Sequence, residues 1–187
     1  MAHSHLLGLA LAFYGAMAAA AGAWGYFGDN PVLLWRPGRA SLPLAGLGLL
    51  AGVAFGLLVV GSSRQLMRFG WAARLAHWFA TVLGPLTWAQ AGLMAGASAL
   101  AEELLFRGAI QRSWGLSAST LLFALAHFPP ERRLWPWTLW AGVMGLTFGV
   151  GTRLTGNLAF AITAHFVINL FNLRYLSRLE PAGDPHP

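Results

Sequence analysis

Residues 42–61 read LPLAGLGLLAGVAFGLLVVG, a run of 20 residues without a charged side chain. An α-helix rises about 1.5 Å per residue, so this run would form a helix about 30 Å long, which matches the hydrocarbon thickness of a bilayer. Small residues within it, as at Gly46, Gly48, Gly52 and Gly56, predict that the backbone of a neighbouring helix approaches closely. The stretch therefore predicts a membrane-spanning helix.

Similar apolar runs on both sides predict an all-α fold, a polytopic transmembrane helix bundle with about six spans. We expect an interruption of the third span at Gly84-Pro85. The fourth is too short to cross alone, at roughly 20 Å, and should pack inside the bundle. The expected spans are residues 6–27, 42–61, 78–113, 116–128, 134–151 and 157–176.

The rest of the chain adds little beyond these spans. Arg64, Arg68 and Arg74 alternate with apolar residues between the second and third spans, which predicts a basic helix at the lipid headgroups. We interpret residues 1–179 as a single transmembrane peptidase domain and residues 180–187 as a disordered tail.

Composition supports a membrane protein over a soluble one. Charged residues make up 10% of the chain and hydrophobic residues 57%, whereas a soluble domain carries about 25% charged residues. The net charge of +6 comes from scattered arginines, which suit loops facing anionic headgroups better than an arm that binds nucleic acid. We expect an integral protein of a bacterial inner (cell) membrane, with the lipid bilayer as a partner and no nucleic acid. Cysteine is absent, which excludes thiolate chemistry.

Two adjacent carboxylates stand out, because only Glu102 and Glu103 lie in a helical apolar context. An ionisable residue at membrane depth costs at least about 2.5 kcal/mol on insertion scales. Glu103 and Arg107 are four residues apart, hence on one helix face and able to pair. Glu102 points about 100° away and has no local partner. The pair is either a structural ion-pair cluster or part of a functional site.

Polar groups on two other apolar helices complete the pattern. His127 closes the short fourth helix, and His165 and Asn169 share one face of the sixth. Taken singly, each fits a core histidine or a polar contact between helices. Taken together, they supply what hydrolysis of an amide requires. A carboxylate takes a proton from water, an imidazole protonates the leaving amine, and N–H groups stabilise the oxyanion.

On these residues the sequence resembles the CAAX protease and bacteriocin-processing family of intramembrane peptidases, also called the CPBP or Abi family. The family motif Glu-Glu-x-x-x-Arg matches residues 102–107. The motif Phe-x-x-x-His matches Phe123 to His127, and His-x-x-x-Asn matches residues 165–169. The resemblance covers about residues 85–173, nearly half the chain, and the first two spans carry no family motif.

The resemblance implies a glutamate-type mechanism. Glu102 would act with His127 to activate water, while Glu103 would pair with Arg107 and hold the helix geometry. The oxyanion hole would be formed by the last motif, His165 and Asn169.

A zinc-dependent version of the same protease stays open, because the family has also been described as metal-dependent. Glu102, His127 and His165 would then form a His₂Glu site. The sequence has no His-Glu-x-x-His signature, so we favour a mechanism without a metal cofactor.

The family does not fix the substrate. The chain is small and has no soluble domain. It fits processing of a membrane-anchored protein or peptide precursor, including sortase-like trimming of C-terminal sorting tags, better than prenyl-protein processing. The alternative class is a non-enzymatic membrane protein, such as a small transporter or an immunity or scaffold protein, that uses the polar stripe for binding. A transporter would show repeated halves, and the sequence contains no convincing repeat.

Overall fold

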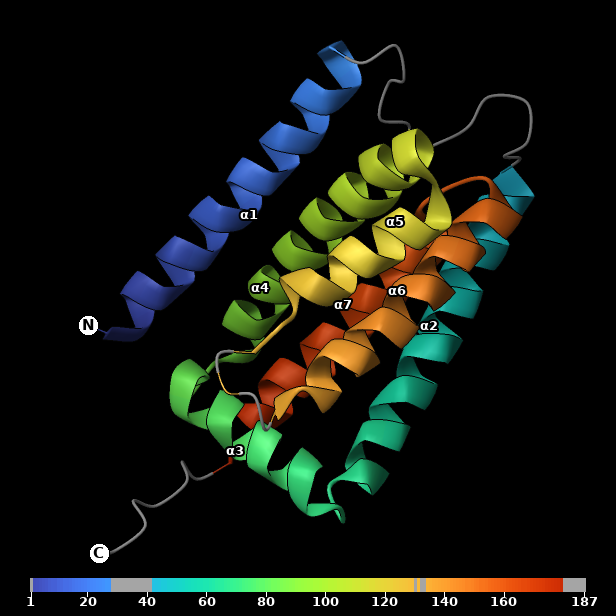
Figure 1. The fold of residues 1–187 in the computed structure, drawn as a ribbon. Coiled ribbons are helices and arrows are strands. Elements are labelled where there is room, and N and C mark those ends of the chain that lie inside the picture. The colour runs from blue at the N-terminus through green and yellow to red at the C-terminus, as the bar shows by residue number, and fades with distance from the viewer. Residues whose placement is uncertain (1, 28–41, 130, 132–133, 180–187) are drawn as a thin grey trace, which may run out of the picture.

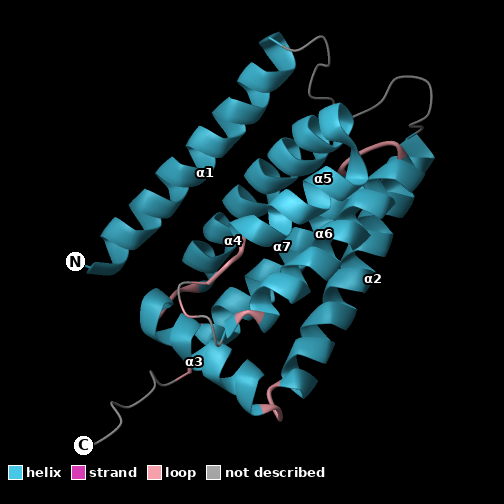
Figure 2. Cartoon of the chain, viewed as in Figure 1, coloured by secondary structure: helices cyan, strands magenta, loops and turns pink. Residues whose placement is uncertain are grey.

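The computed structural model describes residues 2–27, 42–129, 131 and 134–179, and the regular elements among them are all helices (Figure 2). The predicted all-α class is confirmed. In chain order the elements are α1 (Ala2–Phe27), α2 (Leu42–Leu66), α3 (Gly70–Leu83), α4 (Trp88–Glu103), the π-helix η1 (Leu104–Ile110), α5 (Gln111–Ala126), α6 (Pro136–Thr155) and α7 (Ala159–Leu176).

The helices form a bundle in which successive long helices run in alternating directions (Figure 1). α7 packs between α2 and α4, while α5 packs on α6 and η1. α1 lies at one edge, against α4 and η1. The short α3 lies across the end of the bundle at which α1 begins and α7 ends (Figure 1). The arrangement is a helix bundle, as the apolar runs predict, but the short fourth helix, α5, lies at its surface and not inside it, with Leu121 and Leu125 more than half exposed.

Three helices are long and apolar enough to cross a membrane, judged by length and composition among the described residues. They are Leu7–Phe27 of α1, Leu42–Leu66 of α2 and Ala159–Leu176 of α7. α6 is also long enough, with 20 residues, and α4 runs directly into η1. Their hydropathy is lower, because α6 is rich in glycine and threonine and the end of α4 carries the two glutamates.

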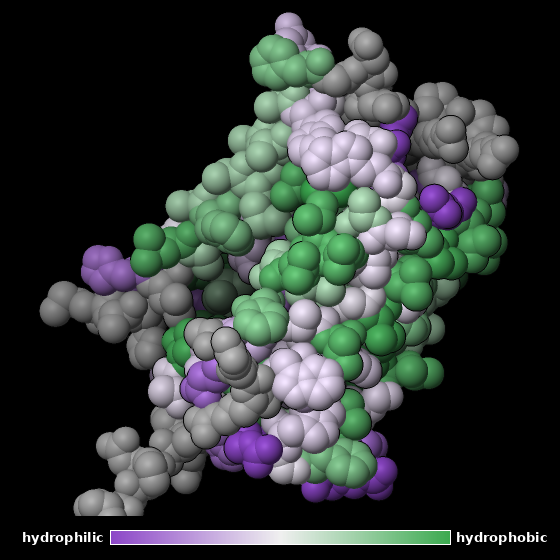
Figure 3. Space-filling model, viewed as in Figure 1, coloured by the Kyte–Doolittle hydropathy of each residue, from purple (hydrophilic) through white to green (hydrophobic). Residues whose placement is uncertain are grey.

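The surface fits a lipid environment. α2 exposes large apolar side chains on the side away from α7, among them Leu47, Leu50 and Leu58, each more than half exposed. Apolar residues cover much of the middle of the face in Figure 3, and hydrophilic residues lie mainly toward its ends. This distribution matches an apolar band between two headgroup regions.

The third span begins ten residues later than predicted, at Trp88 instead of Trp78. Gly84 takes a positive φ of 58° and precedes Pro85, so the chain breaks there and Trp78 belongs to α3. α4 then starts with a capping box between Thr87 and Gln90, with the Thr87 N–H donating to Gln90 Oε1 at 2.9 Å. The predicted interruption is therefore a true helix boundary.

The predicted basic interfacial helix is found only in part. α3 carries Arg74, but Arg64 lies in the last turn of α2. The predicted disordered tail, residues 180–187, lies outside the described residues.

Close packing of α2 on α7 depends on a glycine stripe, as the sequence predicts. A Cβ added at Gly52 would lie 2.8 Å from the Phe160 carbonyl oxygen, and one at Gly56 would lie 2.8 Å from Val167 Cβ. Gly46 does not belong to the stripe, because a Cβ there would meet nothing within 4 Å.

Candidate active site

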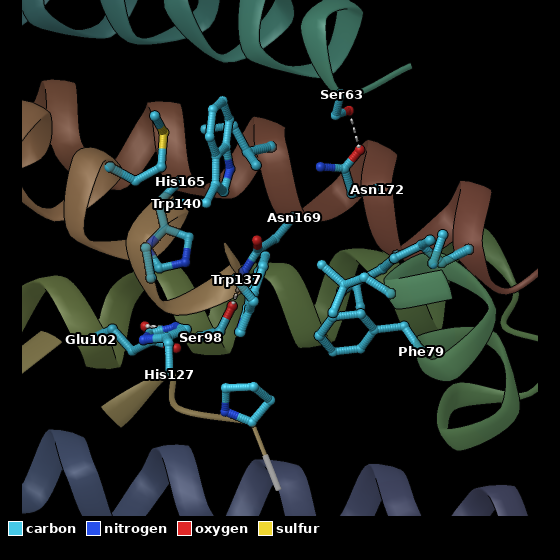
Figure 4. A pocket seen from close by; sticks show the side chains of 18 of the residues that line it. Ser63, Phe79, Ser98, Glu102, His127, Trp137, Trp140, His165, Asn169 and Asn172 are labelled. Carbon is cyan, nitrogen blue, oxygen red and sulfur yellow. Dashed lines mark hydrogen bonds and ion pairs between the residues drawn. The ribbon is translucent and has the colours of Figure 1, made fainter. Parts of the chain in front are cut away.

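A cavity of about 510 Å³ lies inside the bundle, and its wall is mostly apolar. Glu102 of α4, His127 at the end of α5, and His165 and Asn169 of α7 all line it (Figure 4). The structure thus brings together the three helix segments that the sequence singles out. A volume of this size is typical of a pocket for a small molecule or a short peptide segment.

Glu103 is the centre of a buried cluster. Its Oε1 accepts a hydrogen bond from Arg107 Nη1 at 3.0 Å and another from His165 Nδ1 at 2.8 Å. Arg107 Nη2 donates to the carbonyl oxygen of Gly145 on α6 at 3.0 Å. The ion pair of Glu103 with Arg107 is found as predicted. The contact with His165 was missed, because 62 residues separate the partners and no local spacing reveals it.

The contact with Glu103 also fixes how His165 is protonated. An ionised carboxylate only accepts hydrogen bonds, so the proton of this contact sits on His165 Nδ1. His165 stacks on Phe148, with ring centroids 5.5 Å apart. Its Nε2 is the ring nitrogen left for the cavity.

Glu102 has a different environment. Its Oε2 lies 3.7 Å from His127 Nε2, and no described side chain or backbone group donates a hydrogen bond to that oxygen. His127 Nδ1 donates to the Phe123 carbonyl oxygen at 2.8 Å, which orients the ring so that Nε2 faces Glu102. With the ring proton on Nδ1, His127 Nε2 is a hydrogen-bond acceptor. Two acceptors, Glu102 Oε2 and His127 Nε2, therefore face each other at the cavity without a direct hydrogen bond.

The aromatic residue of the second motif joins the two environments. Phe123 is buried, the Arg107 guanidinium lies 4.2 Å from its ring centroid, and the His127 ring lies 4.4 Å from it. The flat ring therefore fixes the spacing between the buried cation and the cavity imidazole.

Asn169 is held by a residue that the sequence analysis missed. Its Nδ2 donates to Ser98 Oγ at 2.9 Å, and Ser98 Oγ donates to the Ala95 carbonyl oxygen at 3.2 Å (Figure 4). Ser98 lies four residues before Glu102, so both share one face of α4. That spacing of four residues could have identified Ser98 from the sequence.

Tyr14 of α1 is a second missed residue, and no spacing could have revealed it. Its side chain lines the cavity, interacts with Ser98 and lies within electrostatic reach of Glu102. α1 carries no motif, so only the packing of α1 on α4 brings this hydroxyl to the site.

The residues fit a metal ion poorly. Each imidazole has its Nδ1 occupied and its Nε2 free, an arrangement common among zinc ligands. However, no group of three or more His, Cys, Asp or Glu side chains in the described part of the chain lies close enough together to hold a metal.

The fold and the cavity define an integral membrane protein with a polar site inside a helix bundle. Residues 84–171 match the family model described as type II CAAX prenyl endopeptidase Rce1-like. Over 73 residues the chain is 44% identical to the uncharacterized protein YpbD of Bacillus subtilis (strain 168). The aligned segment covers 38% of this chain and 37% of that relative. No solved structure matches the chain. The matched segment contains all three motifs and is similar to the CAAX protease and bacteriocin-processing family, as the sequence predicts.

Proposed function

We propose that the protein is an intramembrane endopeptidase in which Glu102 and His127 activate water. The observation that carries this proposal is the pair of unbonded acceptors, Glu102 Oε2 and His127 Nε2, facing each other at 3.7 Å beside the cavity. One water molecule can donate a hydrogen to each acceptor at this separation. Such a water would be oriented and ready to lose a proton.

The reaction follows from that placement. Glu102 takes a proton from the water, and the water oxygen attacks the carbonyl carbon of the scissile peptide bond. The tetrahedral intermediate then collapses, the C–N bond breaks, and the proton passes from Glu102 or His127 to the leaving nitrogen. The products are a new carboxyl terminus and a new amine.

The oxyanion is assigned to Asn169 and His165. Asn169 carries two amide hydrogens and gives one to Ser98, which leaves the second for the oxyanion. His165 can donate to the oxyanion only through Nε2, because Nδ1 is engaged with Glu103, so in this role it acts as the imidazolium, which carries a proton on both ring nitrogens. Preorganised donors of this kind stabilise a developing negative charge without reorganising.

The proposed substrate is a membrane-associated protein or peptide precursor, with trimming of C-terminal sorting tags as one such reaction. The cavity lies within the bundle and its wall is mainly aromatic and aliphatic, which suits a segment that arrives from the bilayer. We also propose a bacterial inner membrane as the location and a mechanism without a metal cofactor.

The test is cleavage of a membrane-anchored peptide reporter by the purified protein in vesicles. We expect Glu102→Gln to lower the cleavage rate about 10³-fold or more, because it removes the base and preserves the shape of the side chain. Glu180→Gln, a carboxylate of the tail, is the control and should cleave normally. Normal cleavage by Glu102→Gln would refute the proposal and favour a binding protein.

A further inference from the structure

Arg64 in the last turn of α2 is a cation whose hydrogen-bond and ring partners are all neutral. Its Nη1 donates to Asn172 Oδ1 at 3.0 Å, and its Nη2 donates to the Phe171 carbonyl oxygen at 3.1 Å. Its guanidinium carbon lies 3.6 Å from the ring centroid of Tyr175. Among the described residues no carboxylate pairs with it. The guanidinium is held firmly, but its charge is not compensated.

This cation belongs to the same cavity as the glutamate. Arg64 and Asn172 line it together with Glu102 and His165. Figure 4 shows Ser63 and Asn172 bonded to each other at one side of the pocket, away from Glu102. Asn172 follows His165 by seven residues on α7, which corresponds to about 10.5 Å along the helix. The cavity therefore has a carboxylate in one part and a cation in another.

The guanidinium still has donors to offer. It carries five N–H groups, and three of them meet Asn172, Phe171 and, at 3.5 Å, Ser63, which leaves two. Arginine stays charged in proteins, and its flat fork matches a carboxylate. Asn172 and Tyr175 fix the fork in advance, so little side-chain freedom is lost when an anion binds.

We propose that Arg64, held by Asn172 and Tyr175, is a subsite for a carboxylate of the peptide substrate. This inference rests on the proposed peptidase function and specifies what it recognises. An extended peptide advances about 3.3 Å per residue, so the carboxylate would lie within a few residues of the cleaved bond. It belongs either to the free C-terminus or to an acidic side chain. A peptide carboxylate is favoured over a lipid phosphate because Arg64 lines the cavity that holds Glu102.

The test measures binding, not cleavage, in the Glu102→Gln protein reconstituted in phosphatidylcholine nanodiscs. Three labelled peptides share one sequence and differ in charge. One ends in a free carboxylate, one in a carboxamide, and one in a carboxamide with an internal Asn replaced by Asp. We expect one of the two carboxylate peptides to bind at least tenfold more tightly than the neutral peptide, and which one identifies the source of the carboxylate.

Variants of Arg64 decide whether this residue is responsible. Arg64→Gln should remove the difference between the peptides, and Arg64→Lys should keep part of it. Arg68→Gln is the matched control, because Arg68 is exposed near the same end of α2 and does not line the cavity. Neutralising the tail with Glu180→Gln and Asp184→Asn should leave the discrimination in place.

Equal binding of all three peptides, or discrimination that survives in Arg64→Gln, would overturn the inference. So would a thermal shift on adding phosphatidylglycerol that depends on Arg64 while the peptides bind alike, because Arg64 would then bind a headgroup. The peptidase proposal fails separately, through the absence of cleavage by the wild-type protein.

Discussion

The two neighbouring glutamates at the end of α4 occupy opposite environments. Glu103 lies in the buried cluster with Arg107 and His165, where one of its oxygens accepts two hydrogen bonds. Glu102 lies in the cavity pair with His127, where its Oε2 is 3.7 Å from His127 Nε2 and accepts no hydrogen bond from the described residues. One residue of helix rotation, about 100°, therefore separates a carboxylate that is hydrogen-bonded inside the protein from one that faces the cavity.

The backbone supports the same division. The π-helix η1 begins directly after Glu103, packs mainly on α5 and α1, and leads into α5 at Gln111. Arg107 and Gln111 donate to the carbonyl oxygens of Gly145 and Gly149 at 3.0 and 2.9 Å. π-Helical turns are often found at functional sites, and here the turn anchors the cluster while Glu102 stays on the α-helical part.

The largest expected effect on stability separates the two glutamates. Glu103→Gln should lower the free energy of unfolding by about 3–5 kcal/mol, because it leaves Arg107 buried without its anion. Glu102→Gln should change it by no more than about 1 kcal/mol, because among the described residues no buried cation is hydrogen-bonded to Glu102. Unfolding of both variants in the same detergent measures the difference. Equal stabilities would contradict the division into cluster and cavity pair.

The next prediction tests whether His165, which bonds Glu103 in the buried cluster, also donates to the oxyanion in the cavity. His165→Asn should lower kcat about 10²–10³-fold but leave a measurable rate, because an amide can still donate to the oxyanion. Strong chelation should leave the wild-type rate unchanged. Metal analysis of the active protein provides the check. About one zinc per chain, lost and regained together with activity, would make His165 a ligand instead.

Local spacing explains what the sequence could predict of this site. The pair of Glu103 and Arg107 follows from an i, i+4 relation, and the three motifs identify cavity residues on α4, α5 and α7. The bond between His165 and Glu103 depends on how two helices pack, and nothing in either segment encodes it. The π-turn was equally invisible, because the run 104–110 is an ordinary apolar stretch with one arginine.

The fold shows the same limit. Apolar runs predict the bundle, and a glycine with a following proline predicts the break between α3 and α4. They do not predict which helix lines the cavity. α1 looks like a plain apolar span, but its position against α4 brings Tyr14 to Ser98.

A smaller effect on kcat is expected at Ser98, which only orients the cavity residue Asn169. Ser98→Ala should lower kcat about tenfold with little change in KM, because Asn169 stays in place but loses the acceptor that orients its amide. Asn169→Ala should cost more, about 10²-fold, because the donor itself is lost. Steady-state kinetics of the two variants compares them. An effect of Ser98→Ala on KM alone would argue that Ser98 contacts the substrate instead.

The smallest effect is expected at Tyr14, which lies outside the family segment. Tyr14→Phe keeps the ring that lines the cavity and removes only the hydroxyl that meets Ser98. A lost hydrogen bond of about 0.5–1.5 kcal/mol corresponds to a roughly two- to tenfold lower kcat.

If Tyr14 acts only through Ser98, the substitution should have almost no effect in the Ser98→Ala background, because the two changes remove the same contact. A double-mutant cycle on kcat measures this coupling. Additive effects would mean that the hydroxyl acts directly on Glu102 or on the substrate, which would make α1 part of the cavity chemistry.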